Sequence, residues 1–174
     1  ISDASRFIDD QTTNTLEIVQ QAAALMTADG RAMTDDNIFS ILERYSIMET
    51  FSEVYYIDAE NTIYQPGSVK RLLADAEIRE QLEAGVSKVY VDNVETGDGY
   101  RGCVFYMVPV NRGYAHFGEL VAVQEIGDLL QSSSFQTLGE EGDVYLIGAK
   151  GSVYAKKEKN HALTEESPVE VFFN

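Results

Sequence analysis

Metal binding and nucleophilic catalysis depend most often on histidine and cysteine, and this chain has two histidines and one cysteine. Neither His116 nor His161 has a second histidine or cysteine at the spacing of a zinc site. Cys103 would need a histidine beside it to act as a nucleophile. It opens an apolar run after a glycine turn, which is typical of a small packed residue. These residues therefore predict neither a metal site nor a catalytic thiol.

Two further patterns could bind phosphate or calcium. The segment GDGYRG at 97–102 lacks the lysine and the following helix of a phosphate loop, so it is expected to be a hairpin turn. The acidic pairs at 35–36 and 140–141 do not have the spacing of a calcium loop and are typical of solvated surfaces. Nothing in the spacing selects a pair of carboxylates for glycoside chemistry. We therefore expect this segment to be no enzyme and to need no cofactor.

Composition limits the class of protein and its partners. The 174 residues are 44% hydrophobic, enough for a buried core, and the net charge of −16 would repel nucleic acid and anionic lipids. The single cysteine allows no internal disulfide and fits either redox compartment. No run approaches the roughly 18 apolar residues of a membrane span, and the first residues do not form a signal peptide. Because the chain begins at Ile1, we expect a segment whose flanks are missing.

One eleven-residue pattern occurs twice, ninety positions apart. Residues 54–64 read VYYIDAENTIY and residues 144–154 read VYLIGAKGSVY, with identity at five positions. Each copy has an apolar run, a polar centre and an apolar exit, the pattern of a β-hairpin. Asn61 and Gly151 fall at the same offset, where a left-handed backbone is tolerated. The repeat predicts two copies of one small sheet unit.

Two helices are predicted before the first hairpin. The first covers 2–27, carries its apolar residues on one stripe and leads in from outside the core. Asp29 and Gly30 should end it, and Thr34 should cap a second helix over 34–45. The expected buried face of the second helix is Ile38, Ile41, Leu42 and Tyr45.

A third helix is predicted after the first hairpin. Pro66 and Gly67 should end the hairpin, and Ser68 should cap a helix over 69–84 that ends at Gly85.

Most of the remaining sequence has the residue pattern of β-strands. The runs KVYVDNV, CVFYMVPV and FGELVAVQEI are separated by turns. We expect one antiparallel sheet of about five strands over 54–126, flanked by the helices at 34–45 and 69–84. A short helix at 126–131 should precede the second hairpin. The tail after that hairpin is short and polar, so the second unit is expected to be incomplete.

The order of these elements resembles the double Cache family of extracytoplasmic sensor domains. The resemblance rests on the long first helix and on YYIDAENTIY, IREQLEAG, VYVDNVETGDGYRGCVFYMVPV and FGELVAVQEIGDLL running into GDVYLIGAKGSVYA. It implies an α+β fold: a PAS-like antiparallel sheet with flanking helices, preceded by a long N-terminal helix and followed by a second, incomplete PAS-like unit. The implied domains are the N-terminal helix at 1–33, a membrane-distal Cache lobe at 34–131 and a partial membrane-proximal lobe at 132–174.

The resemblance also implies a function. Such a domain senses a small molecule outside the cytoplasm for a transmembrane signal-transduction receptor, and membrane helices outside this segment anchor it. The cytoplasmic output implied by the resemblance is a GGDEF diguanylate cyclase, a histidine kinase or a chemoreceptor signalling domain. A homodimer through the long N-terminal helix is compatible with this architecture. The alternative is a module that senses by docking a protein partner, without a small-molecule ligand.

The resemblance points to an arginine in the ligand site. Arg79, in IREQL, matches the family's arginine that reaches into the cavity of the distal lobe. Its planar guanidinium can bind a carboxylate through two parallel hydrogen bonds, so a small carboxylate is the implied ligand. The alternative is a solvated helix arginine paired with Glu83. The family's amino-acid-binding members place aromatic residues after this arginine, where this chain has Gln81 and Leu82.

Strand alternation adds the remaining site residues. Tyr90 and Asp92 should share one face of their strand, and Tyr106 should lie on one face of the next. The alternative is that these tyrosines are ordinary half-buried sheet residues. Gln124 stands where amino-acid-binding members of the family carry an aspartate, so their usual chemistry is not implied here. The predicted ligand-binding residues are Arg79, Tyr90, Asp92, Tyr106 and Gln124.

Overall fold

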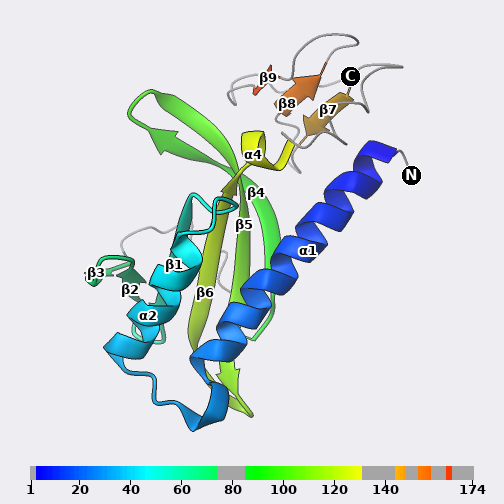
Figure 1. The fold of residues 1–174 in the computed structure, drawn as a ribbon. Helices are drawn as coiled ribbons and strands as arrows, with labels where there is room; N and C mark the ends of the chain where they lie inside the picture. The colour runs from blue at the N-terminus through cyan, green and yellow to red at the C-terminus, as the bar shows by residue number, and fades with distance from the viewer. Residues whose placement is uncertain (1–2, 74–84, 131–143, 148–152, 158–163, 166–174) are drawn as a thin grey trace. The chain divides into compact units, whose positions relative to one another are not determined.

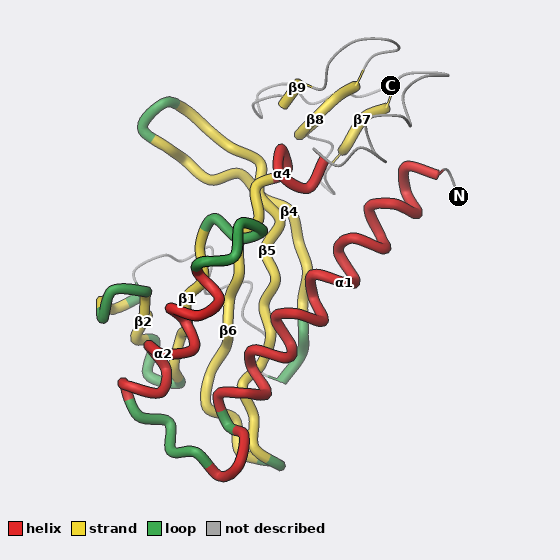
Figure 2. The backbone as a smooth tube through the Cα atoms, viewed as in Figure 1, coloured by secondary structure: helices red, strands yellow, loops and turns green. Residues whose placement is uncertain are grey.

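The chain folds into two compact units. In the computed structural model, residues 3–73, 85–130, 144–147, 153–157 and 164–165 are described (Figures 1 and 2). The first unit consists of residues 14–89 and 105–123. The second consists of residues 1–13, 90–104 and 124–174.

The two predicted N-terminal helices are confirmed. Helix α1 (Asp3–Met26) buries Val19, Ala22, Ala23 and Met26, which lie on one stripe. A short 3-10 turn, η1 (Ala28–Gly30), follows it, and Asp29 and Gly30 there have φ values of 54° and 67°. None of the described helices combines the length and the apolar character needed to cross a bilayer.

Helix α2 (Asp35–Ser46) begins at the predicted cap. The Oγ1 of Thr34 accepts a hydrogen bond from the N–H of Asn37 at 3.3 Å. Ile38, Ile41 and Leu42 are buried as expected, whereas Tyr45 is only half-buried. In Figure 1 this helix lies over β1 and β2, so its apolar stripe covers one face of the sheet.

The predicted antiparallel sheet is confirmed, and it has six strands in the order β3-β2-β1-β6-β5-β4. The strands are β1 (Glu53–Asp58), β2 (Thr62–Gln65), β3 (Val69–Leu72), β4 (Lys88–Thr96), β5 (Gly99–Arg112) and β6 (Ala115–Glu125). The first hairpin is β1 and β2, with Ile57 opposite Ile63. Asn61 has a φ of 61°, as its place in the turn predicts.

The prediction of a third helix over 69–84 is wrong at its start. Residues 69–72 form β3, which pairs antiparallel with β2 from Gln65↔Val69 to Thr62↔Leu72. Ser68 has a φ of 59° and belongs to the tight turn between these strands, so it caps no helix there. Val69 and Leu72 have the spacing of one helical face, but the free edge of β2 offers backbone partners that sequence periodicity does not reveal. The remainder of that predicted helix, 74–84, lies outside the described residues.

The second unit contains the later copy of the repeat. Helix α4 (Ile126–Leu130) confirms the predicted short helix, and β7 (Val144–Ile147) pairs antiparallel with β8 (Val153–Lys157), which confirms the second hairpin. A third strand, β9 (Thr164–Glu165), pairs with β8. Ile147 lies opposite Val153, as Ile57 lies opposite Ile63 in the first copy. A register shift follows at Leu146, and the turn with Gly151 lies outside the described residues.

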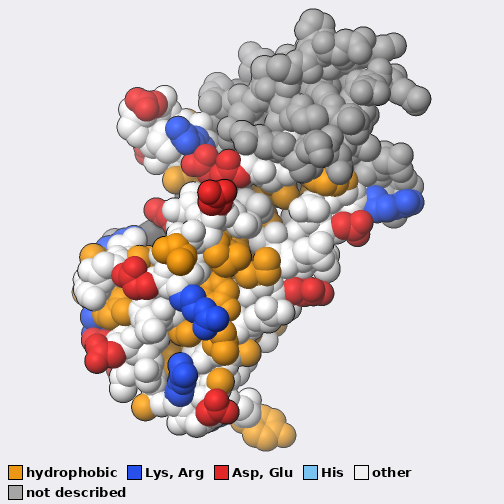
Figure 3. Space-filling view, viewed as in Figure 1, with side chains coloured by type: hydrophobic (Ala, Val, Ile, Leu, Met, Phe, Trp, Pro, Cys, Tyr) orange, Lys and Arg blue, Asp and Glu red, His pale blue; other side chains and the backbone are white. Residues whose placement is uncertain are grey.

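The surface of the first unit mixes apolar and charged side chains. Figure 3 shows apolar side chains gathered between α1 and α2, with acidic and basic side chains around them. Beneath this surface, the middle of β5 and of β6 is buried on both faces. The core of the first unit therefore lies along these two central strands.

Candidate functional site

Strand register in the first unit separates the sheet into two faces, and α2 covers one of them. Tyr56 on β1 lies opposite Tyr64 on β2 and Leu120 on β6, so these three side chains share a face. Phe39 of α2 packs against Tyr64 with ring centroids 5.7 Å apart. We call this side the helix face and the opposite side the far face.

Polar groups on the helix face hold the first hairpin together. Oδ1 of Asp58 accepts the N–H groups of Glu60 and Thr62, each at 2.9 Å, and its Oδ2 accepts the hydroxyl of Tyr64 at 3.3 Å. The hydroxyl of Tyr56 donates to the carbonyl of Phe117 at 2.7 Å, and burial raises the pKa of this phenol. A shallow hollow of about 230 Å³ lies among these residues. Its polar groups are already used within the fold.

The far face is buried although α2 lies on the other side of the sheet. Ile57 lies opposite Ile63 on β2 and Glu119 on β6, so these side chains share the far face. The chain leaves β3 at Leu73, whose N–H donates to the carbonyl of Asn61 at 2.8 Å. The other buried residues of this face are Tyr55, Val121 and Val123.

Glu119 is a buried carboxyl group in this apolar setting. Its exposed fraction is 5%, and neither carboxylate oxygen has a hydrogen-bond partner of normal geometry among the described residues. Burial raises the pKa of Glu119 to about 7, and the nearby backbone N–H of Gly85 offsets part of that increase. A carboxyl group so placed can be protonated or ionised near neutral pH.

His116 lies beside this carboxyl group. Its Nε2 is 3.3 Å from Oε1 of Glu119, and its Nδ1 is 2.7 Å from Oδ1 of Asn111. One ring nitrogen of His116 therefore faces Glu119, and the other faces Asn111.

The same turn is tied to the end of α1. The hydroxyl of Thr27 donates to the carbonyl of Asn111 at 3.0 Å, and Nη2 of Arg112 donates to the carbonyls of Thr27 and Arg31. The contacts of Glu119, His116 and Asn111 thus lead from the far face to the C-terminal end of the long helix.

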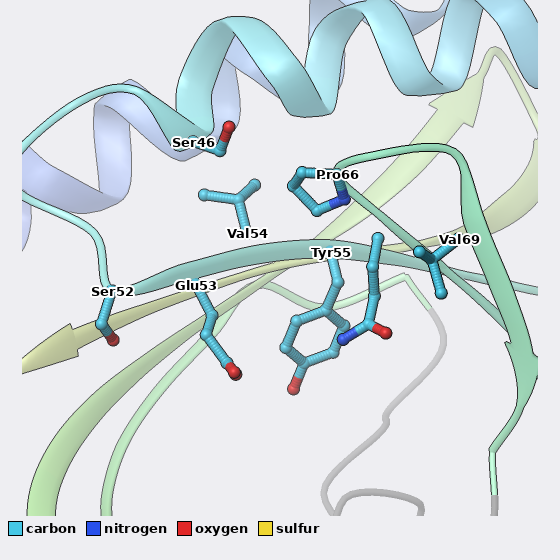
Figure 4. Close-up of a pocket in the computed structure, with 8 residues that line it drawn as sticks. Ser46, Ser52, Glu53, Val54, Tyr55, Pro66 and Val69 are labelled. Carbon is cyan, nitrogen blue, oxygen red and sulfur yellow. The ribbon is translucent and has the colours of Figure 1, made fainter.

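A larger surface hollow, of about 380 Å³, lies at the end of β1 and the edge of β3 (Figure 4). Figure 4 shows Glu53 and Tyr55 on one side of the β1 ribbon, and Ser46, Val54 and Pro66 on the other. Since Tyr55 also belongs to the far face, this hollow reaches the rim of that face. The full lining is Ser46, Ser52, Glu53, Val54, Tyr55, Gln65, Pro66 and Val69.

Three of the predicted ligand-binding residues belong to the second unit. Tyr90 and Asp92 are half-buried on β4, and Oδ1 of Asp92 accepts the N–H of Asn93 at 2.8 Å. Gln124 is 5% exposed near the end of β6. All residues on the face of Tyr90 and Asp92 are half-buried, whereas the other face of β4 carries the exposed Val89 and Glu95.

Of the other two predicted residues, one lies among the described residues and one does not. Tyr106 lies in the first unit, is fully buried, and its hydroxyl is hydrogen-bonded to the side chain of Thr15 on α1. Arg79 lies outside the described residues. A common cavity for Arg79, Tyr90, Asp92, Tyr106 and Gln124 therefore stays a prediction.

Glu119 is a candidate functional residue that the sequence reasoning missed. A usable signal was present, because Glu119, Val121 and Val123 alternate in FGELVAVQE and so share a face with two apolar residues. An acidic residue aligned with apolar ones on a central strand predicts a buried carboxyl group. No group of three or more His, Cys, Asp or Glu side chains within the described part of the chain could hold a metal ion.

Comparison with known proteins identifies the fold. No protein-family model matches the chain, and no curated protein sequence matches it either. Solved structures do match. The ligand-binding domain of the amino-acid chemoreceptor PctC of Pseudomonas aeruginosa, in complex with GABA, is 16% identical with a TM-score of 0.59. The match covers 86% of this chain and 69% of that one.

Two further structures support the same conclusion. The ligand-binding domain of the chemoreceptor CtaA of Pseudomonas fluorescens, in complex with L-valine, is 14% identical with a TM-score of 0.62, covering 84% of this chain and 67% of that one. A domain of a sensory box/GGDEF family protein from Vibrio parahaemolyticus is 11% identical with a TM-score of 0.54, covering 86% and 67%. The chain therefore has the fold of bacterial sensory domains, which confirms the α+β, PAS-like fold implied by the resemblance to double Cache domains.

Proposed function

We propose that this chain is an extracytoplasmic sensory domain that binds a small molecule for a transmembrane receptor. The observation that carries the proposal is the fold, because the structure matches sensory domains solved with GABA and with L-valine over 86% and 84% of this chain, with TM-scores of 0.59 and 0.62. Fold alone does not define a ligand, so the chemistry of the site must supply it.

The receptor context follows from the same likeness. A GGDEF family protein among the similar structures supports an output such as a diguanylate cyclase. A histidine kinase and a chemoreceptor signalling domain are the other output classes implied by the resemblance. Membrane helices on either side of this segment would anchor it outside the cytoplasm. We divide it into the N-terminal helix at 1–33, a ligand-binding lobe at 34–131 and a partial membrane-proximal lobe at 132–174. Catalysis would belong to the output module.

The ligand would lie in the first of these lobes. Arg79 would bind a carboxylate of the ligand through its planar guanidinium, with Tyr90, Asp92, Tyr106 and Gln124 as further contacts. The support for this set is the match of Arg79 to the arginine of the resembled family and the half-buried positions of Tyr90 and Asp92.

A thermal-shift screen tests the proposal. Small carboxylates, amines and nucleobases would be added at about 100 times the dissociation constant, where binding to the native state adds about 2.7 kcal/mol. For a chain of this size, that gain raises the Tm by roughly 5–10 °C. Arg79→Ala should abolish the shift caused by a carboxylate. Arg44→Ala, which removes an exposed arginine from the last turn of α2, should leave it unchanged.

The opposite result of the screen would contradict the proposal. If no small molecule raises the Tm of the wild-type protein, the small-molecule proposal is wrong, and the module that docks a protein partner becomes the better explanation.

A further inference from the structure

A buried carboxyl group with few hydrogen-bond donors around it is costly, which makes Glu119 unusual. Burying an acid in apolar surroundings is unfavourable unless donors satisfy its oxygens. On the β1 side of the sheet, the far-face neighbours of Glu119 are Ile57 on β1 and, beyond it, Ile63 on β2, and neither side chain can donate. Asp58, another acidic residue of the first unit, differs in this respect. Its carboxylate accepts hydrogen bonds from two backbone N–H groups and one hydroxyl.

An ion pair with His116 does not account for Glu119. The His116 side chain is 32% exposed and approaches one oxygen only, at 3.3 Å, without the geometry of a hydrogen bond. A buried ion pair offsets its desolvation cost only when further hydrogen bonds satisfy the remaining lone pairs. Here, within the described part of the chain, Oε2 accepts no hydrogen bond of normal geometry. Acceptor capacity on this side chain is therefore unused.

Ionised carboxylates are acceptors only, so the group that fits Glu119 is a donor that carries positive charge. We infer that Glu119 is a specificity-determining residue of the first unit that binds a protonated primary amine of the ligand. This inference rests on the proposed sensory function and adds a cationic contact at a position outside the predicted set. Its geometric basis is the buried, under-satisfied carboxyl group on the far face, beside the backbone of Gly85.

Binding of an ammonium group would displace a proton from the site. Titratable groups that interact with Glu119 include His116 on β6 and Tyr56 on β1, and Gly85 contributes its backbone. Burial raises the pKa of Glu119, so its carboxyl group holds a proton over part of the neutral range, and a positive charge beside it favours loss of that proton to solvent. Affinity for the amine should therefore increase with pH between about 6 and 8.

Matched pairs of compounds test the inference. The pairs are ethanolamine with ethylene glycol, putrescine with 1,4-butanediol, and 4-aminobutyrate with butyrate; the second member of each pair lacks the ammonium group. At least one amine should raise the Tm of the wild-type protein at pH 8, while its matched partner should not. Calorimetry at pH 6.5 in two buffers with different ionisation enthalpies should then detect proton release on binding.

Two variants complete the experiment. Glu119→Gln keeps the shape of the side chain and should weaken amine binding by about tenfold or more, with loss of proton release. Glu17→Gln removes an exposed carboxylate from α1 and should change neither the affinity for the amine nor the proton release. Far-UV circular dichroism and the Tm of each variant establish that it folds.

The outcomes separate the two proposals. If the wild-type protein responds only to compounds without an ammonium group, or if Glu119→Gln binds an amine as tightly as the wild type, the inference is wrong and the sensory function stands. A wild-type protein that responds to nothing, including the full screen above, overturns the sensory function and the inference with it.

Discussion

The buried carboxyl group of Glu119 should make the stability of the protein depend on pH in a direction opposite to most carboxylates. Its pKa is raised from 4.5 to about 7 in the folded protein, mainly by burial. Folding therefore favours the protonated form. The stabilising contribution is fully present below pH 4.5, and it is lost as the pH rises through about 7.

The size of the effect follows from the raised pKa. At about 1.4 kcal/mol for each pH unit, the difference between 4.5 and about 7 corresponds to about 3 kcal/mol. Glutamine has nearly the same shape and cannot ionise, so Glu119→Gln removes this term. The variant should gain stability relative to the wild type as the pH rises from 5 to 8. In a chain of this size, the gain is roughly 6–12 °C in Tm.

The assay is a pair of thermal melts at each pH from 5 to 8, without added ligand. The informative quantity is the Tm of Glu119→Gln minus that of the wild type, because titration of the many exposed carboxylates cancels in the difference. A difference that stays constant over this range would refute the reasoning, since it would mean that Glu119 ionises normally in the folded protein.

Two further predictions concern the packing of the first unit. A Cβ on Gly118 would collide with the carbonyl oxygen of Ile57, so Gly118→Ala should lower the free energy of unfolding in urea by about 2–3 kcal/mol. The control is Gly97→Ala, which has open space around it and should lower the same free energy by less than about 1 kcal/mol. Equal losses in the two variants would contradict this account. Thr34→Ala removes the acceptor for the N–H of Asn37 and should cost about 1 kcal/mol in the same assay, while Thr34→Ser should retain most of that stability.

Local patterns predicted the elements that local interactions determine. Thr34 caps α2 because its hydroxyl accepts an N–H three residues later, and Asn61 turns the first hairpin with a left-handed backbone. The repeat predicted a second hairpin, and its pair Ile147 and Val153 corresponds to Ile57 and Ile63 in the first, with a register shift next to it at Leu146. Each of these features depends on residues within a few positions of one another.

Pairings between distant residues were harder to predict. Residues 69–72 form a strand because β2 presents a free edge, and nothing within VKRL records that edge. The burial of Glu119 depends on Ile57, more than sixty positions earlier in the chain, so alternation along β6 alone did not draw attention to it. Tyr106 was placed correctly in a strand, but its contact with Thr15 depends on where α1 packs.

Under the proposed sensory function, the contacts at the end of α1 would have a mechanical consequence. Side chains of Thr27 and Arg112 join the helix end to the β5–β6 turn through backbone carbonyls of both partners. His116 begins the route from this turn along β6 to Glu119, so no flexible loop separates the far face from the helix. These contacts hold β6 and the end of α1 together. A shift of β6 along its own axis by even a fraction of an ångström would therefore displace the end of α1.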